Sequence, residues 1–378
     1  MKIAIFSNTC YETIVPVVNE LEIIGHSVDF YALTSNKGSG KAVLFETNKL
    51  WENEKQGNII PDINIKKYIS ECWNPYLKRG KWFSLYFHNF AFFKPNNWNL
   101  ILAIIKKIRK EKYDILHFNA ESLLFNILAL IFNKKKIVFE IHDVNPHTGE
   151  NHFIAKLIRQ SFKLLRTTNF IVHSNFSKKE LLEKYSYLNP NQVHYIPFGS
   201  HEWLKTDSKT LELNNSLLFF GRISPYKGIE ILCEAVRDLC EEIHNIKLTV
   251  AGNGKMYFDY KNYESDNISF INRYISNKEL SELVYSHQII VCPYIDATQS
   301  GVIQSALTLN KWIIATNVGA IPEMIETGKN GMLISPNNIS ELKQAIKESL
   351  YQEKYKFYKP VIQKSWKEIT ALLIRIYE

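Results

Sequence analysis

The segment LLFFGRISPYKG at residues 217–228 constrains the fold of this chain more than any other stretch. Four apolar residues, 217–220, predict a buried strand, and Gly228 is followed by IEILCEAVRDL, whose apolar residues recur at helical spacing. The connecting loop therefore lies at the carboxyl end of a strand and the amino end of a helix. This order is typical of a parallel α/β sheet, in which ligands bind at that edge.

The same loop carries two cations five positions apart, Arg222 and Lys227, after the glycine Gly221. Free amides at a helix start and the helix dipole favour phosphate, a guanidinium grips two oxygens, and an ammonium adds a point charge. A diphosphate can bind the helix amides, the guanidinium and the ammonium at the same time. The alternative is a solvated loop with two surface cations, and the flanking strand, glycines and helix argue against it.

Strand and helix signals alternate along the rest of the chain, which predicts two Rossmann-like lobes with sheets that are parallel throughout. The first 197 residues form one lobe and 198–358 the other, and 359–378 hold a last helix from Ser365. The loop after the first strand lacks a GxGxxG fingerprint, so we expect no dinucleotide there. Strands are expected at 2–7, 27–33, 114–119, 136–141, 171–174, 193–199, 246–254, 267–276, 289–294 and 312–316, and helices at 13–24, from 100, 123–132 and from 301.

Composition agrees with a two-domain protein without a membrane span. The 378 residues are 46% hydrophobic, enough for two cores, and no run of 18 uncharged apolar residues occurs. The sequence enters a strand at once, with no signal peptide, so we expect a cytoplasmic protein. Five scattered cysteines suggest reduced core residues and no zinc site.

Charge is uneven. Residues 1–200 carry 26 Lys and Arg against 17 Asp and Glu, whereas residues 201–378 carry 20 against 21. The basic first half suggests an acidic partner such as a nucleic acid, an anionic lipid or a phosphorylated substrate.

A second group of titratable residues follows the predicted strand KIVFEI, in the loop HDVNPHTGE. It contains His142, Asp143, His147 and Glu150, at a strand end where sites form, which makes them candidates for acid–base work. Structural histidines are the alternative. A metal site is less favoured, because no third ligand follows at helical spacing.

These segments resemble the group 1 glycosyltransferases of family 4, which have two Rossmann-like lobes in the GT-B arrangement, facing one another across a cleft. Most of the second half matches. The similar segments are FFGRISPYKG, TVAGNG, VCPYIDATQSG, IATNVGAIPE and the closing SWKEI helix, with HDVNPHTGE and IVHSNFSKKEL in the first half. In this family the closing helix crosses back to the first lobe.

The resemblance implies retaining transfer from a nucleotide-diphosphate sugar held by the second lobe to an acceptor held by the first. Arg222 and Lys227, with Gly221, would bind the donor diphosphate, and His142 would lie beside the donor sugar. Asp143 or His147 would receive the acceptor proton if the leaving phosphate does not. Gly252, Gly254 and Tyr274 fall at the nucleotide. No metal and no cofactor are implied, and no Asp-x-Asp motif occurs.

The sequence departs from the family at a pair of glutamates eight positions apart. Thr298 stands at the first position, and Ser305 or Ala306 at the second. A branch of the family with a similar TQSGV segment also lacks the pair, which implies a changed grip on the sugar. We expect the hydroxyl and amide groups of residues 298–301 and 305 to hold it: Thr298, Gln299, Ser300, Gly301 and Ser305.

Other functions stay open. A sugar-nucleotide epimerase or a phosphorylase shares this frame, although no pyridoxal lysine is identifiable. A basic nucleic-acid binder would use the lysines at 106–112 and 134–136, but no repeated nucleic-acid-binding motif accompanies them, so we expect no nucleic acid.

The acceptor is expected to be a lipid-diphosphate-linked glycan of O-antigen, capsule or exopolysaccharide synthesis. Residues 72–98 mix ten aromatics with four cations, and residues 153–166 have apolar positions on one helical face. Such segments suit the inner face of the cytoplasmic membrane, where the protein would be peripheral. Core packing explains the aromatics equally well.

Overall fold

A computed structural model gives the conformation of residues 1–35, 47–89, 94–134, 136–145, 160–165, 168–206, 210–361 and 363–378. The chain divides into two compact units. The first combines most of residues 1–199 with residues 364–378, and the second contains residues 200–363. The predicted first boundary lay after residue 197, and the last predicted segment began at residue 359.

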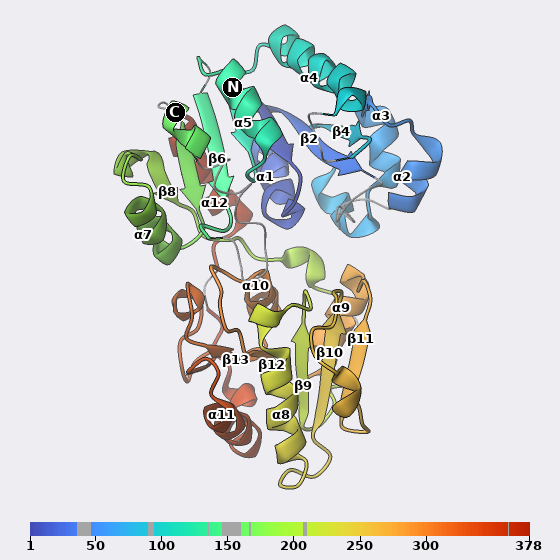
Figure 1. Cartoon of the computed structure of the whole chain (residues 1–378), viewed down its shortest axis with the longest axis vertical. Helices are drawn as coiled ribbons and strands as arrows, with labels where there is room; N and C mark the ends of the chain where they lie inside the picture. The colour runs from blue at the N-terminus through green and yellow to red at the C-terminus, as the bar shows by residue number, and fades with distance from the viewer. Residues whose placement is uncertain are drawn as a thin grey trace. The chain divides into compact units, whose positions relative to one another are not determined.

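The first unit is built on an eight-stranded sheet of order β3-β4-β2-β1-β5-β6-β7-β8 (Figure 1). Its strands are β1 (Lys2–Ser7), β2 (Ser27–Ser35), β3 (Asn58–Ile60), β4 (Lys81–Phe87), β5 (Ile115–Phe118), β6 (Lys136–Ile141), β7 (Asn169–Val172) and β8 (Val193–Tyr195). Its helices are α1 (Tyr11–Ile23), α2 (Thr47–Asn53), α3 (Asp62–Ile65), α4 (Trp98–Glu111), α5 (Leu123–Ile131), α7 (Asn175–Lys184) and α12 (Trp366–Tyr377).

Strand β4 corrects two expectations. It pairs with β3 in antiparallel register, so the prediction of sheets that are parallel throughout is wrong for this unit. It also lies within residues 72–98, which were interpreted as a membrane-facing segment. Five aromatics of that segment are buried in the first unit: Trp73, Trp82, Phe83, Tyr86 and Phe87. A strand covered on both faces buries successive residues, which explains the aromatic run without a membrane.

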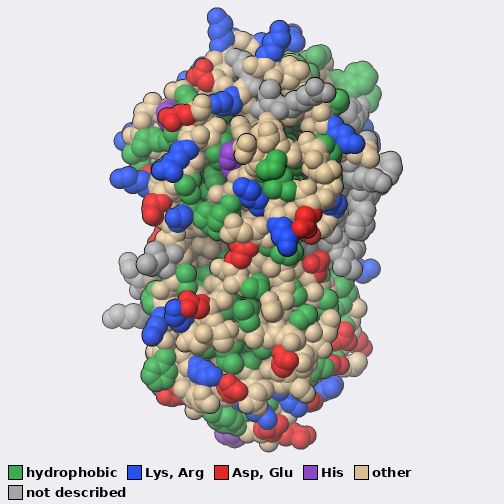
Figure 2. Space-filling model, turned by 90° about the vertical axis from the view of Figure 1, so that its left-hand side faces the viewer, with side chains coloured by type: hydrophobic (Ala, Val, Ile, Leu, Met, Phe, Trp, Pro, Cys, Tyr) green, Lys and Arg blue, Asp and Glu red, His purple; other side chains and the backbone are tan. Residues whose placement is uncertain are grey.

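The other predicted membrane segment, residues 153–166, lies mostly outside the described residues. Ser161–Leu164 form a short 3-10 helix. Three cations at the start of β4 are exposed, namely Lys78 and Arg79 before the strand and Lys81 as its first residue. On the face seen in Figure 2, Lys and Arg side chains are spread among acidic ones. None of the helices in the described part of the chain has the length and apolar character needed to cross a bilayer.

Helix α12 is part of the first unit, although it follows the whole second unit in sequence. It begins with a capping box, in which Ser365 and Glu368 satisfy each other's backbone amides. Trp366 lies flat against Gly199, where a Cβ would come within 2.8 Å of the indole ring. Side chains from the same face of α12 are buried with it: Ile369, Thr370, Leu373, Ile376 and Tyr377.

The second unit is a six-stranded parallel sheet of order β11-β10-β9-β12-β13-β14. Its strands are β9 (Ser216–Phe220), β10 (Lys247–Gly252), β11 (Ile268–Asn272), β12 (Ile289–Cys292), β13 (Trp312–Thr316) and β14 (Gly331–Ile334). Its helices are α8 (Ile229–Leu239), α9 (Asn277–Ser286), α10 (Gly301–Thr308) and α11 (Ile339–Tyr351). The predicted apolar face of α8 is buried. Cys233 and Cys292 are free and buried, and Cys10 and Cys240 are free and partly buried.

In both sheets the order in which successive strands are added reverses at the strand that comes first in the sequence. In the second unit it runs from β9 outward to β10 and β11, then returns to β12 on the other side of β9. In the first unit the corresponding pair is β1 and β5. Loops diverge at such points and leave a crevice at the carboxyl ends of the strands, where open α/β sheets bind ligands.

Candidate functional site

The loop after β9 lies at the reversal point of the second unit. Gly221 and Gly228 have positive φ angles of 123° and 64°, which permit the sharp turns at its two ends. Between them Pro225–Lys227 form a single 3-10 turn before α8. Gly228 has a second reason to be glycine, because a Cβ there would lie 2.0 Å from the carbonyl oxygen of Pro293.

The two predicted cations of this loop have different surroundings. Arg222 is exposed, whereas Lys227 is only 7% exposed. The Nζ of Lys227 lies 3.6 Å from the ring centroid of Tyr294 and 4.9 Å from that of Tyr226. The aromatic faces attract the ammonium and hold it at a fixed place beside the strand ends. The loop therefore offers one exposed cation and one buried cation with a fixed position.

Gly252 and Gly254, predicted at the nucleotide, join the loop after β10 to the loop after β9. The amide of Gly221 donates to Ala251 O (3.0 Å), and the amide of Ile223 donates to Asn253 O (3.1 Å). A Cβ on residue 252 would lie 1.7 Å from Gly221 O, and one on residue 254 would lie 2.2 Å from Ile223 O. Both glycines are thus needed for close backbone packing, whatever ligand lies there. Tyr274 follows β11 and is 44% exposed.

The segment TQSG connects β12 to α10 on the other side of the reversal point. Ser300 is the N-cap of α10, and its Oγ accepts a hydrogen bond from the amide of Ile303 (3.2 Å). Thr298 is buried beside it, and Gly301 is the exposed first residue of the helix. The connection from β12 to α10 that contains this segment touches the β9 loop, because Ile295 N donates to Tyr226 O (2.7 Å). Residues predicted to hold the diphosphate and the sugar therefore meet within one unit.

Ser305 has a structural partner that the sequence did not indicate. Its hydroxyl donates to Gly301 O (2.9 Å) and lies 2.8 Å from Nδ1 of His201. Since the hydroxyl hydrogen is used on Gly301, the histidine carries its hydrogen on Nδ1. Burial lowers the pKa of His201 to about 3, so the ring is neutral. In the sequence His201 is an isolated histidine before a predicted strand, and no pattern there predicted its contact with Ser305.

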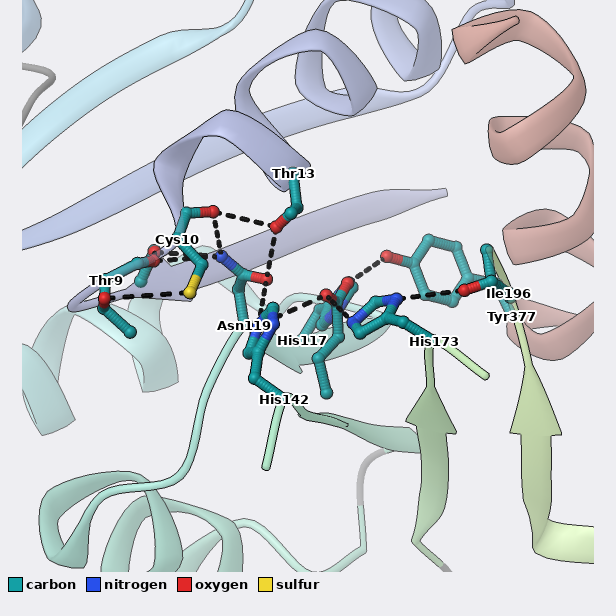
Figure 3. A network of polar contacts seen from close by, with 11 residues as sticks. Thr9, Cys10, Thr13, His117, Asn119, His142, His173, Ile196 and Tyr377 are labelled. Atoms are coloured by element: carbon teal, nitrogen blue, oxygen red, sulfur yellow. Dashed lines mark hydrogen bonds and ion pairs between the residues drawn. The ribbon is translucent and has the colours of Figure 1, made fainter. Parts of the chain in front are cut away.

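Two of the four titratable residues predicted after β6, His142 and Asp143, belong to the first unit. His142 and Asp143 directly follow the strand and are partly exposed, while His147 and Glu150 lie outside the described residues. The carboxyl ends of β5, β6 and β7 place three further residues beside His142 that were not predicted as site residues. These are His117, Glu140 and His173 (Figure 3).

Glu140 is the centre of this group. Its Oε1 lies 3.0 Å from Nε2 of His117, and its Oε2 lies 3.3 Å from Nε2 of His173. Burial by itself raises the pKa of Glu140, but the two imidazoles outweigh it and hold the pKa well below its usual value. The carboxylate is therefore ionised inside the protein. Strand alternation offered a signal, because residues 117, 140, 142 and 173 share one face of adjacent strands.

Asn119 connects His142 to the loop after β1. Its Nδ2 donates to Cys10 O (3.2 Å) and Ser7 Oγ (3.1 Å), which leaves Oδ1 as the acceptor facing His142 Nε2 at 3.3 Å (Figure 3). Cys10 itself has a positive φ of 51° at the start of α1. Burial raises the pKa of the Cys10 thiol well above its usual value, so this sulfur is not a nucleophile.

Comparison with known families matches both halves of the chain. The family model described as Glycosyltransferase Family 4 matches residues 17–200, and the model described as Glycosyl transferases group 1 matches residues 214–352. The chain belongs to the group 1 glycosyltransferases.

Similar sequences include other glycosyltransferases. An uncharacterised glycosyltransferase of Methanocaldococcus jannaschii is 29% identical over 36% of this chain, and the match covers only 38% of that protein's length. An uncharacterised 41.2 kDa protein in the cps region of Klebsiella pneumoniae is 22% identical over 63% of this chain and 69% of its own. A GDP-mannose:glycolipid 4-beta-D-mannosyltransferase of Xanthomonas campestris is 28% identical over 54% and 61%.

Solved structures share the fold of this glycosyltransferase. Sucrose-phosphate synthase from Thermosynechococcus elongatus superposes with a TM-score of 0.68 at 16% identity, covering all of this chain and 98% of that one. Anabaena HepE in complex with UDP-glucose gives a TM-score of 0.64 at 15% identity, covering all of this chain and 96% of HepE. The prediction of two Rossmann-like α/β lobes of the GT-B type is confirmed.

Proposed function

We propose that this protein transfers a sugar, with retention of configuration, from a nucleotide-diphosphate donor to a glycan acceptor. One observation carries the proposal. The reversal point between β9 and β12 is flanked by a turn bearing Arg222 and Lys227 on one side and by the amino end of α10 on the other. Anionic donors fit such an edge, because fixed cations and free helix amides converge there.

The chemistry explains why the cations matter. Breaking the bond between the sugar and the diphosphate leaves negative charge on the departing phosphate, and charges placed beforehand stabilise that change more than they stabilise the bound donor. Lys227 is buried, so its field is weakly screened, and Arg222 adds a second, exposed cation to the same loop. This role replaces the metal that other glycosyltransferases use, and we propose that transfer needs no metal or other cofactor.

The sugar and nucleotide would be held without the glutamate pair. Ser300 and Ser305 also bond within the protein, to Ile303 and His201. Thr298, Gln299 and the first amides of α10 at Gly301 are the other groups that we propose to contact the sugar. The nucleotide would lie along Gly252 and Gly254, with Tyr274 beside it. Donor specificity would then depend on hydroxyl and amide groups.

The acceptor side is assigned to the first unit, with His142 beside the donor sugar and Asp143 and His147 as candidate proton acceptors. We propose a lipid-diphosphate-linked glycan of O-antigen, capsule or exopolysaccharide synthesis as the acceptor, with the protein peripheral on the inner face of the cytoplasmic membrane. Support comes from the cps-region and glycolipid relatives and from the basic first half of the chain.

The donor is identified first. Thermal unfolding is measured with UDP, GDP, ADP and their sugars, since a ligand that binds the folded state raises the apparent stability. Transfer from the stabilising donor is then compared between the wild type and the variants Arg222→Ala and Lys227→Ala. We expect each to lose roughly 100-fold or more in turnover. Lys278→Ala, which removes an exposed cation of α9, is the matched control.

Three further readouts separate the alternatives. NMR of the product reports the anomeric configuration, and an inverted product would disprove retention. EDTA is expected to leave turnover unchanged, and a complete loss restored by Mn²⁺ would contradict metal independence. Conversion of the donor to an epimer without any acceptor would assign an epimerase. Normal turnover in both cation variants would remove the phosphate-loop assignment.

A further inference from the structure

Three side chains of the first unit bring potential metal ligands together. One ligand atom each from Glu140, His142 and His173 lies within 4.8 Å of the other two. All three come from the ends of β6 and β7, and Glu140 and His173 are almost fully buried. The prediction that no third ligand is present applied only to helical spacing along the sequence. Here the third ligand comes from the neighbouring strand.

The contact between Glu140 and His173 is the most informative. Nδ1 of His173 lies 2.9 Å from Ile196 O and must donate its hydrogen to that carbonyl. Nε2 of His173 is therefore left directed at Oε2 of Glu140, 3.3 Å away. Both atoms are buried and neither has a hydrogen bond. A cation bound to both atoms would give each of them a partner inside the protein.

The second histidine completes a set of the right size. Nε2 of His142 lies 3.8 Å from Oε2 of Glu140, and its ring stacks on that of His173 with centroids 4.9 Å apart. Zinc bonds of about 2.0–2.1 Å in a tetrahedron place neighbouring ligand atoms about 3.3 Å apart. The observed spacings need only a small closure, in which His142 would exchange its contact with Asn119 Oδ1 for the metal.

The surroundings also match a metal site. The hydrogen bond from His173 to Ile196 O is the outer contact that fixes the tautomer and orientation of a metal-binding histidine. His117 supports the other carboxylate oxygen of Glu140 from 3.0 Å away. A small pocket lined by Glu140, His173 and Thr13 adjoins the ligands and leaves space for a further ligand such as water.

We propose that Glu140, His142 and His173 bind one divalent transition metal of the Zn²⁺ class, with a fourth position open. Two histidines and one glutamate are a ligand set that zinc uses in proteins. The site shares His142 with the proposed acceptor side but takes no part in the proposed transfer, whose charge is stabilised by cations of the second unit, and so it does not rest on the proposed function. Binding requires neutral imidazoles, so it weakens as the pH falls.

Cobalt provides the first test, since tetrahedral Co²⁺ absorbs strongly in the visible. The full chain, without an affinity tag and freed of metal by EDTA, is titrated with Co²⁺, and we expect a band that saturates at one equivalent and is displaced by Zn²⁺. Glu140→Gln and His173→Gln should weaken binding by more than the roughly 10- to 100-fold caused by losing an outer contact. His194→Gln removes a histidine of β8 that bonds Asn169, and is the control.

The wild-type protein gives a second test that does not depend on the folding of the variants. Crystals grown with Zn²⁺ and measured at the zinc absorption edge should show an anomalous peak between Glu140, His142 and His173. No peak there, or a saturating cobalt band that persists in folded Glu140→Gln and His173→Gln proteins, would overturn the proposal. Circular dichroism establishes that each variant is folded before its band is compared.

Discussion

The hydroxyl of Tyr377 lies 2.5 Å from Nδ1 of His117, and both side chains are buried. This contact joins the C-terminal helix to strand β5, whose histidine in turn contacts Glu140. Lys136 adds a second link, because its Nζ donates to Tyr377 O (2.9 Å). Helix α12 is therefore part of the interior of the first unit, and its Tyr377 is linked to Glu140 through His117.

Removing the indole that covers Gly199 should destabilise the protein. Trp366→Ala is expected to lower the free energy of unfolding by about 3–5 kcal/mol, the usual cost of deleting a large buried aromatic. Urea unfolding measures it, and Lys367→Ala, an exposed neighbour on the same helix, should change little. Truncation after Pro360 should lower stability and donor turnover further. An equally stable truncated protein would show that α12 does not contribute to the stability of the first unit.

Two glycine substitutions should differ in their effect on the free energy of unfolding. Gly254→Ala places a Cβ 2.2 Å from Ile223 O and forces the loops after β9 and β10 apart, so we expect a loss of about 1–3 kcal/mol. Gly301→Ala meets no atom closer than 4.0 Å at an exposed helix start and should stay within about 0.5 kcal/mol of the wild type. Chemical unfolding compares them. Equal stabilities would mean that the loops are not tightly packed.

His201 should make stability depend on pH. Its pKa is lowered to about 3 by burial, against about 6.5 in an unfolded chain, so between these values the unfolded state binds more protons. The free energy of unfolding should therefore fall by about 2 kcal/mol between pH 7 and pH 5 on account of this residue. His201→Gln should remove that part of the fall, whereas His244→Gln, at an exposed position, should retain it. Identical pH profiles for the two variants would contradict the assignment.

The membrane proposal now depends on charge, because the aromatics of β4 are buried. Flotation with anionic vesicles is expected for the wild type, to weaken with salt, and to weaken when Lys78, Arg79 and Lys81 are changed to Glu, since each cation near such a surface contributes about 1 kcal/mol. Changing Lys255, Lys261 and Lys278 of the second unit to Glu is the matched control. Flotation with neither anionic nor neutral vesicles would favour a soluble acceptor.

Local patterns predicted the parts of the fold that depend on neighbouring residues. The β9–loop–α8 segment follows from an apolar run, a glycine and an amphipathic pattern, and the start of α12 at Ser365 follows from the amphipathic pattern of the last residues. Strand β4 was missed, because a strand buried on both faces has no alternation and its aromatics resemble a membrane segment. The Glu140 group was missed because its members lie up to 56 positions apart, from His117 to His173, and only strand pairing brings them together.

The discontinuous first unit sets an order of events during synthesis. Residues 200–363 leave the ribosome after β8 and before α12, so the second unit can fold while the surface that α12 covers is still bare. That surface includes Val17, Ile171 and Phe198, which are apolar. The nascent first unit must keep this patch away from other chains for the time needed to make over 160 residues, at about 5–20 residues per second. Slow translation therefore lengthens the time during which this apolar patch can aggregate.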